Sequence, residues 1–292
     1  MARLLVTGTS GYIGKRLVAM ARADGHGVVA PGRTAIPDTQ FFPWSLGESM
    51  PPAALTGVDA VIHLAHSWRA DSGGDAHLNA AAGERLAHQA LAAAIPRFVF
   101  ASTTSARPTA LNAYGRIKYA MEARFGMLPG AAGRIVNARI ALVYGGEPAG
   151  QYATMRKITA LTPILPMVGL DRRVQPIHLD EVCRALLVLA MTPALKEPVY
   201  VVAGAAVGFG QWLKLLRKVQ TGRGLLLVPV PLKILLWISK LTDPALRERL
   251  LGLASTSPMP AAESLKALGI EPGDPQTLLQ REQNAPEDRQ LR

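Results

Sequence analysis

The stretch RLLVTGTSGYIGKRL, residues 3–17, decides the fold. An apolar run leads into three glycines, Gly8, Gly11 and Gly14, and a pair of basic residues follows the last of them. A strand, a tight glycine turn and a helix in this order are what a dinucleotide-binding loop needs. Gly8 would make the turn, Gly11 would let the backbone approach a pyrophosphate, and Gly14 would let the helix pack closely on the strand. A purely structural turn uses the same glycines, so other parts of the chain must decide.

Short β-rich runs alternate with helical patterns through the first two thirds of the chain. We expect strands at 3–8, 27–32, 59–65, 97–103, 134–145 and 197–204, and helices at 13–24, 77–94 and 114–127. Such alternation predicts right-handed βαβ units and a parallel sheet with helices on both faces. The expected class is therefore α/β, a Rossmann-type doubly wound parallel sheet with a smaller C-terminal α/β substrate lobe.

The expected division of the chain follows a change in pattern. From about residue 146 to 175, and again from about 205, strands give way to helices and loops punctuated by proline. We expect a dinucleotide-binding Rossmann domain made of residues 1–145 with 176–204. Residues 146–175 with 205–292 would form the substrate-binding lobe over the carboxyl edge of the sheet, where ligands of such folds bind.

Composition limits the function classes. The chain has 292 residues, is 49% apolar and carries a net charge of +11, so it can bury a large core and attract an anionic partner. Scattered lysines and arginines, only 5% aromatic residues and no stacking or zinc motif disfavour nucleic acid. A basic surface that only maintains solubility explains the charge equally well. The longest apolar stretch, 225–238, is interrupted by Pro229, Pro231 and Lys233 and is too short to span a bilayer, which leaves a membrane-surface role open.

The single cysteine, Cys183, excludes an internal disulfide framework and lies in a helical pattern that would bury it. The first apolar run is too short to resemble a signal peptide. We expect a reducing, cytoplasmic location. His63, His66 and His178 match no zinc spacing, so no metal site is expected.

A second motif, YGRIK, places Tyr114 and Lys118 four residues apart, on one face of the helix that follows strand 97–103. This pair, with the Gly-x-x-Gly-x-x-Gly loop, resembles the short-chain dehydrogenase/reductase superfamily. Further stretches resemble its extended branch, the NAD-dependent epimerase/dehydratase family that modifies sugar nucleotides: GVDAVIHLAH at 57–66, Asn79, RFVFASTTS at 97–105, ARIALVYGG at 138–146 and VQPIHLDEVCRAL at 174–186. The resemblance covers about residues 3–205.

The resemblance implies three catalytic residues, Thr103, Tyr114 and Lys118. A free tyrosine titrates near pH 10, and an ammonium group with an oxidised nicotinamide ring nearby favours its phenolate. Tyr114 would then move the hydroxyl proton of the substrate while hydride passes to or from the ring, and Thr103 would bind the same oxygen. The implied cofactor contacts are Gly8, Ser10, Gly11, Tyr12, Ile13, Gly14, Arg33, Leu64, Ala65, Tyr114 and Lys118.

The end of the second strand indicates which cofactor the chain prefers. NAD-preferring relatives carry an acid there for the ribose 2′-hydroxyl, whereas this chain has Gly32 and Arg33. Arg33 is placed to pair with a 2′-phosphate, with help from Lys15 or Arg16. We expect NADP(H), with NAD(H) as the alternative.

The resemblance also bears on substrate and reaction. It implies a nucleotide sugar held by Thr104, Arg172 and Arg173, although an exposed basic turn accounts for the two arginines equally well. Dehydratases of the branch follow the catalytic threonine with an Asp-Glu pair, whereas Thr104 and Ser105 stand here, so dehydration is not expected. A reductase acting on a 4-keto sugar nucleotide is favoured. A 4-epimerase using tightly bound NAD and a non-catalytic NADPH-binding structural or assembly subunit stay open, and relatives imply a homodimer.

Overall fold

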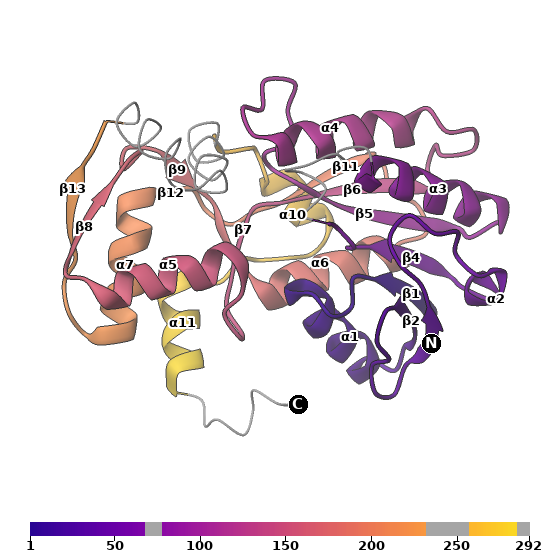
Figure 1. The fold of residues 1–292 in the computed structure, drawn as a ribbon, viewed down its shortest axis with the longest axis horizontal. Helices are drawn as coiled ribbons and strands as arrows, with labels where there is room; N and C mark the ends of the chain where they lie inside the picture. The colour runs from indigo at the N-terminus through magenta and orange to yellow at the C-terminus, as the bar shows by residue number, and fades with distance from the viewer. Residues whose placement is uncertain (68–77, 232–256, 285–292) are drawn as a thin grey trace.

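The computed structural model describes residues 1–67, 78–231 and 257–284 (Figure 1). Its centre is a parallel sheet of seven strands in the order β11-β6-β5-β4-β1-β2-β3. The strands are β1 (Arg3–Thr7), β2 (Gly27–Gly32), β3 (Gln40–Pro43), β4 (Ala60–His63), β5 (Arg97–Thr103), β6 (Ile135–Ile140) and β11 (Val199–Val202). The strand order reverses between β1 and β4, the switch point at which such sheets bind ligands. The expected Rossmann-type doubly wound sheet is confirmed.

Helices cover both faces of this sheet (Figure 1). On one face, α1 (Tyr12–Ala23) and α6 (Leu179–Met191) share an apolar cluster with Leu4 and Val6 of β1. On the other, α3 (Leu78–Ala92) and α4 (Ala113–Gly126) share a cluster with Leu5. Successive strand residues point to opposite faces, so one apolar strand serves both layers. Cys183 of α6 is fully buried, and burial raises the pKa of its thiol to about 12.

The prediction of one strand over 134–145 is wrong. The strand β6 ends at Ile140, and β7 (Leu142–Tyr144) leaves the sheet to pair with β10 (Pro176–His178). The short edge strand β3 and the helix α2 (Pro52–Leu55) were not expected. Both have only four residues, too few to show a periodic pattern.

Most of the remaining elements surround a third apolar cluster, built on Tyr144, Tyr152 and Trp212. They are α5 (Gly150–Leu161), β8 (Ile164–Met167), β9 (Arg173–Val174), β12 (Val207–Gly208), α7 (Phe209–Thr221), β13 (Leu226–Pro229) and α11 (Pro275–Asn284). The short helix α10 (Ala262–Ala267) instead places Leu265 in the first cluster, beside β11. The elements α5, α7, β8 and β13 lie at the left of Figure 1, beyond the end of the large sheet. The expected limits of the two lobes stay a prediction.

Residues 232–256 and 285–292 of the expected substrate-binding lobe lie outside the described residues. The first of these ranges includes residues 232–238, the end of the apolar stretch 225–238. Within the three described ranges, no helix is both long enough and apolar enough to cross a bilayer.

Candidate active site

The glycine loop is closely packed at two of its three glycines. Gly8 follows β1 with a φ of +72°, and a Cβ there would lie 2.8 Å from the backbone nitrogen of Ala65. A Cβ on Gly14 would lie 2.1 Å from the carbonyl oxygen of Gly8. Gly11 is exposed, and its Cβ would approach only that same oxygen, at 3.1 Å. Gly8 and Gly14 therefore allow close packing within the protein, whereas Gly11 and exposed Ser10 face outward.

Hydrogen bonds hold the segment after β4 against this loop. The Thr7 hydroxyl accepts the N–H of Ala65 at 3.2 Å and is bonded to the Nδ1 of His63 at 2.8 Å. The buried side chain of Asn79 accepts the N–H of Ser67 at 2.8 Å and donates to its carbonyl at 3.0 Å. The segment Leu64–Ala65 therefore lies beside Gly8, at the carboxyl ends of β1 and β4.

The His63 imidazole is buried and neutral. Burial, with the charges of Lys118 and His66, lowers its pKa to about 3. Its ring lies near those of Phe98 and Phe100, and its Nε2 is buried without a hydrogen-bond partner in the described structure. His63 is thus a packed core residue.

The helix α4 brings Tyr114 and Lys118 to the end of β5. Lys118 is 2% exposed, and its Nζ donates to the carbonyl of Ala101 at 2.7 Å. The same Nζ lies 4.4 Å from the ring centroid of Phe100 and 5.7 Å from that of Tyr114. The Tyr114 ring meets the His66 ring edge-on, with centroids 5.1 Å apart. The two residues of the YGRIK motif are therefore neighbours, with the ammonium fixed on the sheet.

One turn further along the same face, Glu122 secures this helix. It is 7% exposed and accepts a hydrogen bond from the Ser102 hydroxyl. The Arg139 guanidinium donates to both of its oxygens at 2.5–3.1 Å. Sequence reasoning missed this residue, although its spacing of four from Lys118 places it on the same face of the helix as Tyr114 and Lys118. Glu122 thus joins α4 to β5 and β6.

Thr103 is the last residue of β5 and is buried. Its Oγ1 accepts the N–H of Ser105 at 3.2 Å. The N–H of half-buried Thr104 donates to the carbonyl of Ile140 at 3.1 Å, so the loop leaving β5 begins in a fixed position.

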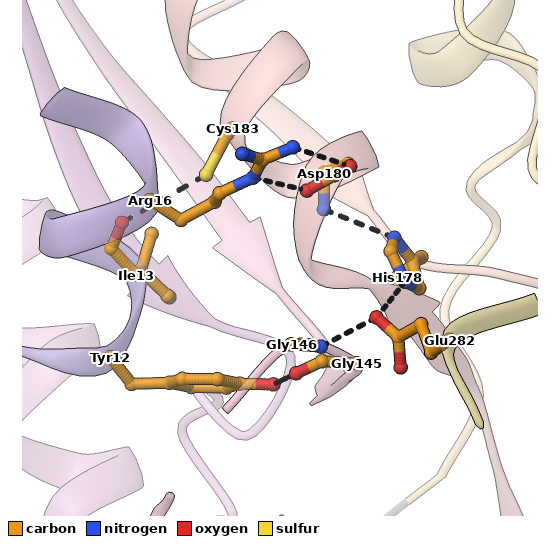
Figure 2. Close-up of polar contacts among 9 residues, drawn as sticks. All are labelled: Tyr12, Ile13, Arg16, Gly145, Gly146, His178, Asp180, Cys183 and Glu282. Carbon is orange, nitrogen blue, oxygen red and sulfur yellow. Dashed lines mark hydrogen bonds and ion pairs between the residues drawn. The ribbon is translucent and has the colours of Figure 1, made fainter. Parts of the chain in front are cut away.

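Figure 2 shows how the first turn of α1 is joined to later parts of the chain. The Tyr12 hydroxyl donates to the carbonyl of Gly145 at 2.5 Å, so its phenol is already used within the protein. The Arg16 guanidinium donates to both carboxylate oxygens of Asp180, at 2.6 and 2.9 Å. The carbonyl of Ile13 accepts from the Cys183 thiol at 3.8 Å. Asp180 therefore already holds Arg16, and the expected help of this arginine toward a 2′-phosphate stays a prediction.

The same network reaches the C-terminal helix. Burial would raise the pKa of Asp180, but the hydrogen bonds and charge of Arg16 lower it. The His178 Nδ1 caps α6 by accepting the N–H of Asp180, and its Nε2 lies 3.0 Å from the Glu282 carboxylate. Glu282 also accepts the N–H of Gly146 at 2.6 Å. Residues of α1, α6, α11 and the loop after β7 thus form one network (Figure 2).

The remaining predicted contacts are exposed cations. Arg33 follows β2, is exposed, and makes no hydrogen bond or ion pair with the rest of the described chain. Lys15 lies 4.0 Å from Glu147, and both are largely exposed. Arg172 and Arg173 are exposed, and Arg173 donates to the carbonyl of Ala206 at 2.7 Å.

Comparisons with known proteins agree with this fold. A model of the NAD dependent epimerase/dehydratase family matches residues 4–203. The UDP-glucose 4-epimerase of Thermotoga maritima has a TM-score of 0.72 and 20% identity over 96% of this chain and 97% of its own. MoeE5, solved with UDP-glucuronic acid and NAD, has a TM-score of 0.76 and 22% identity over 96% and 97%.

A third structure, the UDP-N-acetylglucosamine 4-epimerase of Bacillus cereus, has a TM-score of 0.71 and 16% identity over 96% and 98%. The TM-scores of these three structures establish a shared fold. None of the curated proteins matches the chain.

Proposed function

The chain belongs to the NAD dependent epimerase/dehydratase family, and from this premise we propose that it transfers hydride at a carbon of a sugar nucleotide, with Tyr114 as acid and base. The observation that carries the proposal is the buried Lys118 ammonium, held 2.7 Å from the Ala101 carbonyl and 5.7 Å from the Tyr114 ring. These groups lie at the end of β5, next to β4, which Leu64 and Ala65 follow.

The residues at the switch point fit a dinucleotide. Close packing at Gly8 and Gly14 leaves Gly11 and Ser10 exposed at the N-terminus of α1, where unpaired N–H groups and the helix dipole favour phosphate. We propose that the backbone of residues 8–14 binds the pyrophosphate and that Leu64, Ala65, Tyr114 and Lys118 bind the nicotinamide half. Tyr12 and Ile13 would contribute backbone and packing, since the Tyr12 hydroxyl already binds Gly145.

Each catalytic residue has a separate task in this proposal. When bound, the nicotinamide accepts or donates the hydride. Tyr114 removes the proton of the substrate hydroxyl or returns it, and the Lys118 charge stabilises negative charge on the tyrosine oxygen. The Oγ1 of Thr103 already accepts from Ser105, so its hydroxyl hydrogen can be donated to the same substrate oxygen.

We propose NADP(H) as the preferred cofactor because of Arg33. It is exposed just after β2, where a 2′-phosphate would need a cation, and exposed Lys15 would assist it, since Arg16 is paired with Asp180. NAD(H) remains the alternative, and MoeE5 was solved with NAD. In Arg33→Gln, the Kd for NADP should rise by about 10- to 100-fold, and the Kd for NAD should change little. Equal changes for both cofactors would remove Arg33 from the cofactor site.

The substrate proposal rests on Thr104, Arg172 and Arg173. The two arginines are exposed and suit a diphosphate, although an exposed basic turn has the same appearance. A reductase is favoured for the reason that favours NADP(H), because a one-way reductase exchanges its cofactor after each turnover. A 4-epimerase is the second candidate, and it is favoured if the isolated protein retains NAD. Cytoplasmic location and a homodimer remain predictions.

Substitution of Tyr114 by Phe tests the proposal. Turnover of UDP-sugars with a 4-hydroxyl or 4-keto group should fall by about 10²- to 10⁴-fold, while the thermal shift on adding NADP or NAD persists. Tyr119→Phe is the matched control, because Tyr119 lies on the same helix and is 36% exposed. Unchanged turnover in Tyr114→Phe would contradict the proposal. A protein that binds the cofactor but turns over none of these substrates, with or without Tyr114, would instead be the non-catalytic subunit.

A further inference from the structure

The two-stranded ribbon β8–β13 presents an entirely apolar outer face. The strands pair in parallel, with Ile164 opposite Leu226 and Pro166 opposite Val228. Alternate residues share a face, so these four side chains lie together, and we call them the ribbon face. Ile164 is 52%, Leu226 61% and Val228 41% exposed, whereas Leu165, on the opposite face, is buried in the third cluster.

The ribbon face has an apolar neighbour, and the edges of the ribbon are poorly suited to pairing with another strand. Leu161, the last residue of α5, is 73% exposed and lies three residues before Ile164. Pro166 on β8 and Pro229 on β13 lack the N–H that an added strand would need. Pairing of a further strand is therefore disfavoured at both edges, and the face itself is the surface open to a partner.

The segments that carry the ribbon face are positively charged. The two segments that carry it, 150–170 and 205–231, contain no Asp or Glu. Their basic residues are Arg156, Lys157, Lys214, Arg217, Lys218 and Arg223. Arg217 is buried and donates to backbone carbonyls, whereas Lys157, Lys214, Lys218 and Arg223 are exposed. The nearest acid along the chain is Asp171, which lines a hollow of about 460 Å³ with Met167 and Pro229 at the far end of the ribbon.

We propose that the ribbon face docks on an anionic lipid surface. Exposed aliphatic side chains on segments that carry exposed cations and no carboxylate of their own suit a protein lying on a bilayer, with the apolar groups entering the interface and the cations meeting the headgroups. A second copy fits poorly, because a symmetric contact would place the same cations against one another. The face also lacks the aromatic and hydrogen-bonding side chains on which specific protein interfaces depend.

Its position makes the proposal independent of the chemistry at the sheet. The ribbon lies at the end of the molecule away from the glycine loop and α4 (Figure 1). The predicted absence of a membrane span is compatible with it, because a surface contact needs no spanning helix. The stretch 225–238 leaves a membrane-surface role open. Its described part contains β13, which carries half of the ribbon face.

The test is flotation of the full chain with vesicles. It should bind an equimolar mixture of phosphatidylglycerol and phosphatidylcholine, bind phosphatidylcholine alone weakly, and dissociate at high salt. Replacing Lys157 and Arg223 together by Gln should weaken partitioning about thirtyfold, from about one kcal/mol per cation at an anionic surface. Ile164→Ser with Leu226→Ser should weaken it at least about tenfold.

Matched controls come from the sheet half of the molecule. Met127→Ser removes a side chain that is 74% exposed, and Lys196→Gln with Lys266→Gln removes two exposed cations, so both variants should bind vesicles as the wild type does. Equal binding by the ribbon variants, or no binding by the wild type, would overturn the proposal. A wild-type dimer in sedimentation velocity that the ribbon variants dissociate would assign the face to a second copy instead, and binding of these cations to an acidic protein but not to vesicles would assign it to a protein partner.

Discussion

Charged residues are buried and paired at the sheet, whereas at the ribbon they are exposed. Around α4, Lys118 and Glu122 are buried, and each has fixed partners, the Ala101 carbonyl for one and Ser102 with Arg139 for the other. Around β8–β13, the cations Lys157 and Arg223 are exposed. A buried charge without partners is very costly, so those at the sheet must be held in one geometry. The exposed cations do not need one fixed side-chain geometry, and they are accessible to a partner.

The apolar residues show the reverse contrast. At the sheet, strands such as β5 are buried along their whole length. At the ribbon, Leu165 on the inner face is buried and Leu227 beside it is half-buried, whereas the outer, equally apolar face is exposed. The first arrangement is what a core needs for stability, and the second contributes little to folding. The difference predicts that substitutions at the sheet affect stability and substitutions at the ribbon do not.

The largest effect is expected from Glu122→Ala. The change leaves the Arg139 guanidinium without its carboxylate, and Arg139 is only 20% exposed. Loss of one partner of a buried pair should lower the free energy of unfolding by about 3 kcal/mol, measured by urea denaturation. The control is Glu84→Ala, which removes an exposed pair with Arg124 and should cost at most about 1 kcal/mol. Equal costs would mean that the buried pair has no special role.

Gly14→Ala tests close packing under the glycine loop. The new Cβ would lie 2.1 Å from the Gly8 carbonyl oxygen, so the backbone must shift, at a cost of about 1–3 kcal/mol. Cofactor affinity, followed by calorimetry, should fall with it. Gly126→Ala is the control, because its Cβ meets no atom within 4 Å and the change should preserve or slightly raise stability. A neutral Gly14→Ala would show that the loop can relax.

His63 gives the sheet half a dependence on pH. Its pKa is lowered to about 3, so it takes up a proton more readily when unfolded, and stability falls as the pH falls below the ordinary imidazole pKa. Between about pH 7 and about pH 5 the loss from this group should be about 2 kcal/mol. In His63→Asn, the free energy of unfolding, measured by urea denaturation at each pH, should lose that part of its pH dependence, whatever the absolute stability of the variant. The paired Asp180, whose pKa is lowered, contributes only at more acidic pH. An identical pH dependence in the variant would mean that His63 is accessible to protons when folded.

The smallest effect is expected at the ribbon. Ile164→Ser with Leu226→Ser removes side chains that are more than half exposed, so the free energy of unfolding should change by less than about 0.5 kcal/mol per residue. The same variant is the one that should lose vesicle binding. Strong destabilisation would show that the ribbon face is covered in the folded protein, contrary to its exposure.

Several features of the fold follow from short patterns in the sequence. The glycine spacing after β1, the apolar runs of the central strands and the YGRIK spacing each involve neighbouring residues, and each determines a local turn, a strand or a helix face. The split at Ala141 was not predictable in this way, because β7 leaves the sheet to pair with β10, more than thirty residues later. The two-stranded ribbon was also hidden, since its strands are only four residues long and lie in separate segments.

The sequence alone therefore determined the sheet, its glycine turn and the placing of Tyr114 and Lys118 on one face of a helix, because each depends on periodicity over a few residues. Only the tertiary structure decided that Arg16 belongs to Asp180, that Glu122 belongs to Ser102 and Arg139, and that Glu282 reaches His178. These partners are 17 to 164 residues apart in the chain. A charged side chain looks alike in the sequence whether it is exposed or paired, because its partner is set by the packing of distant elements.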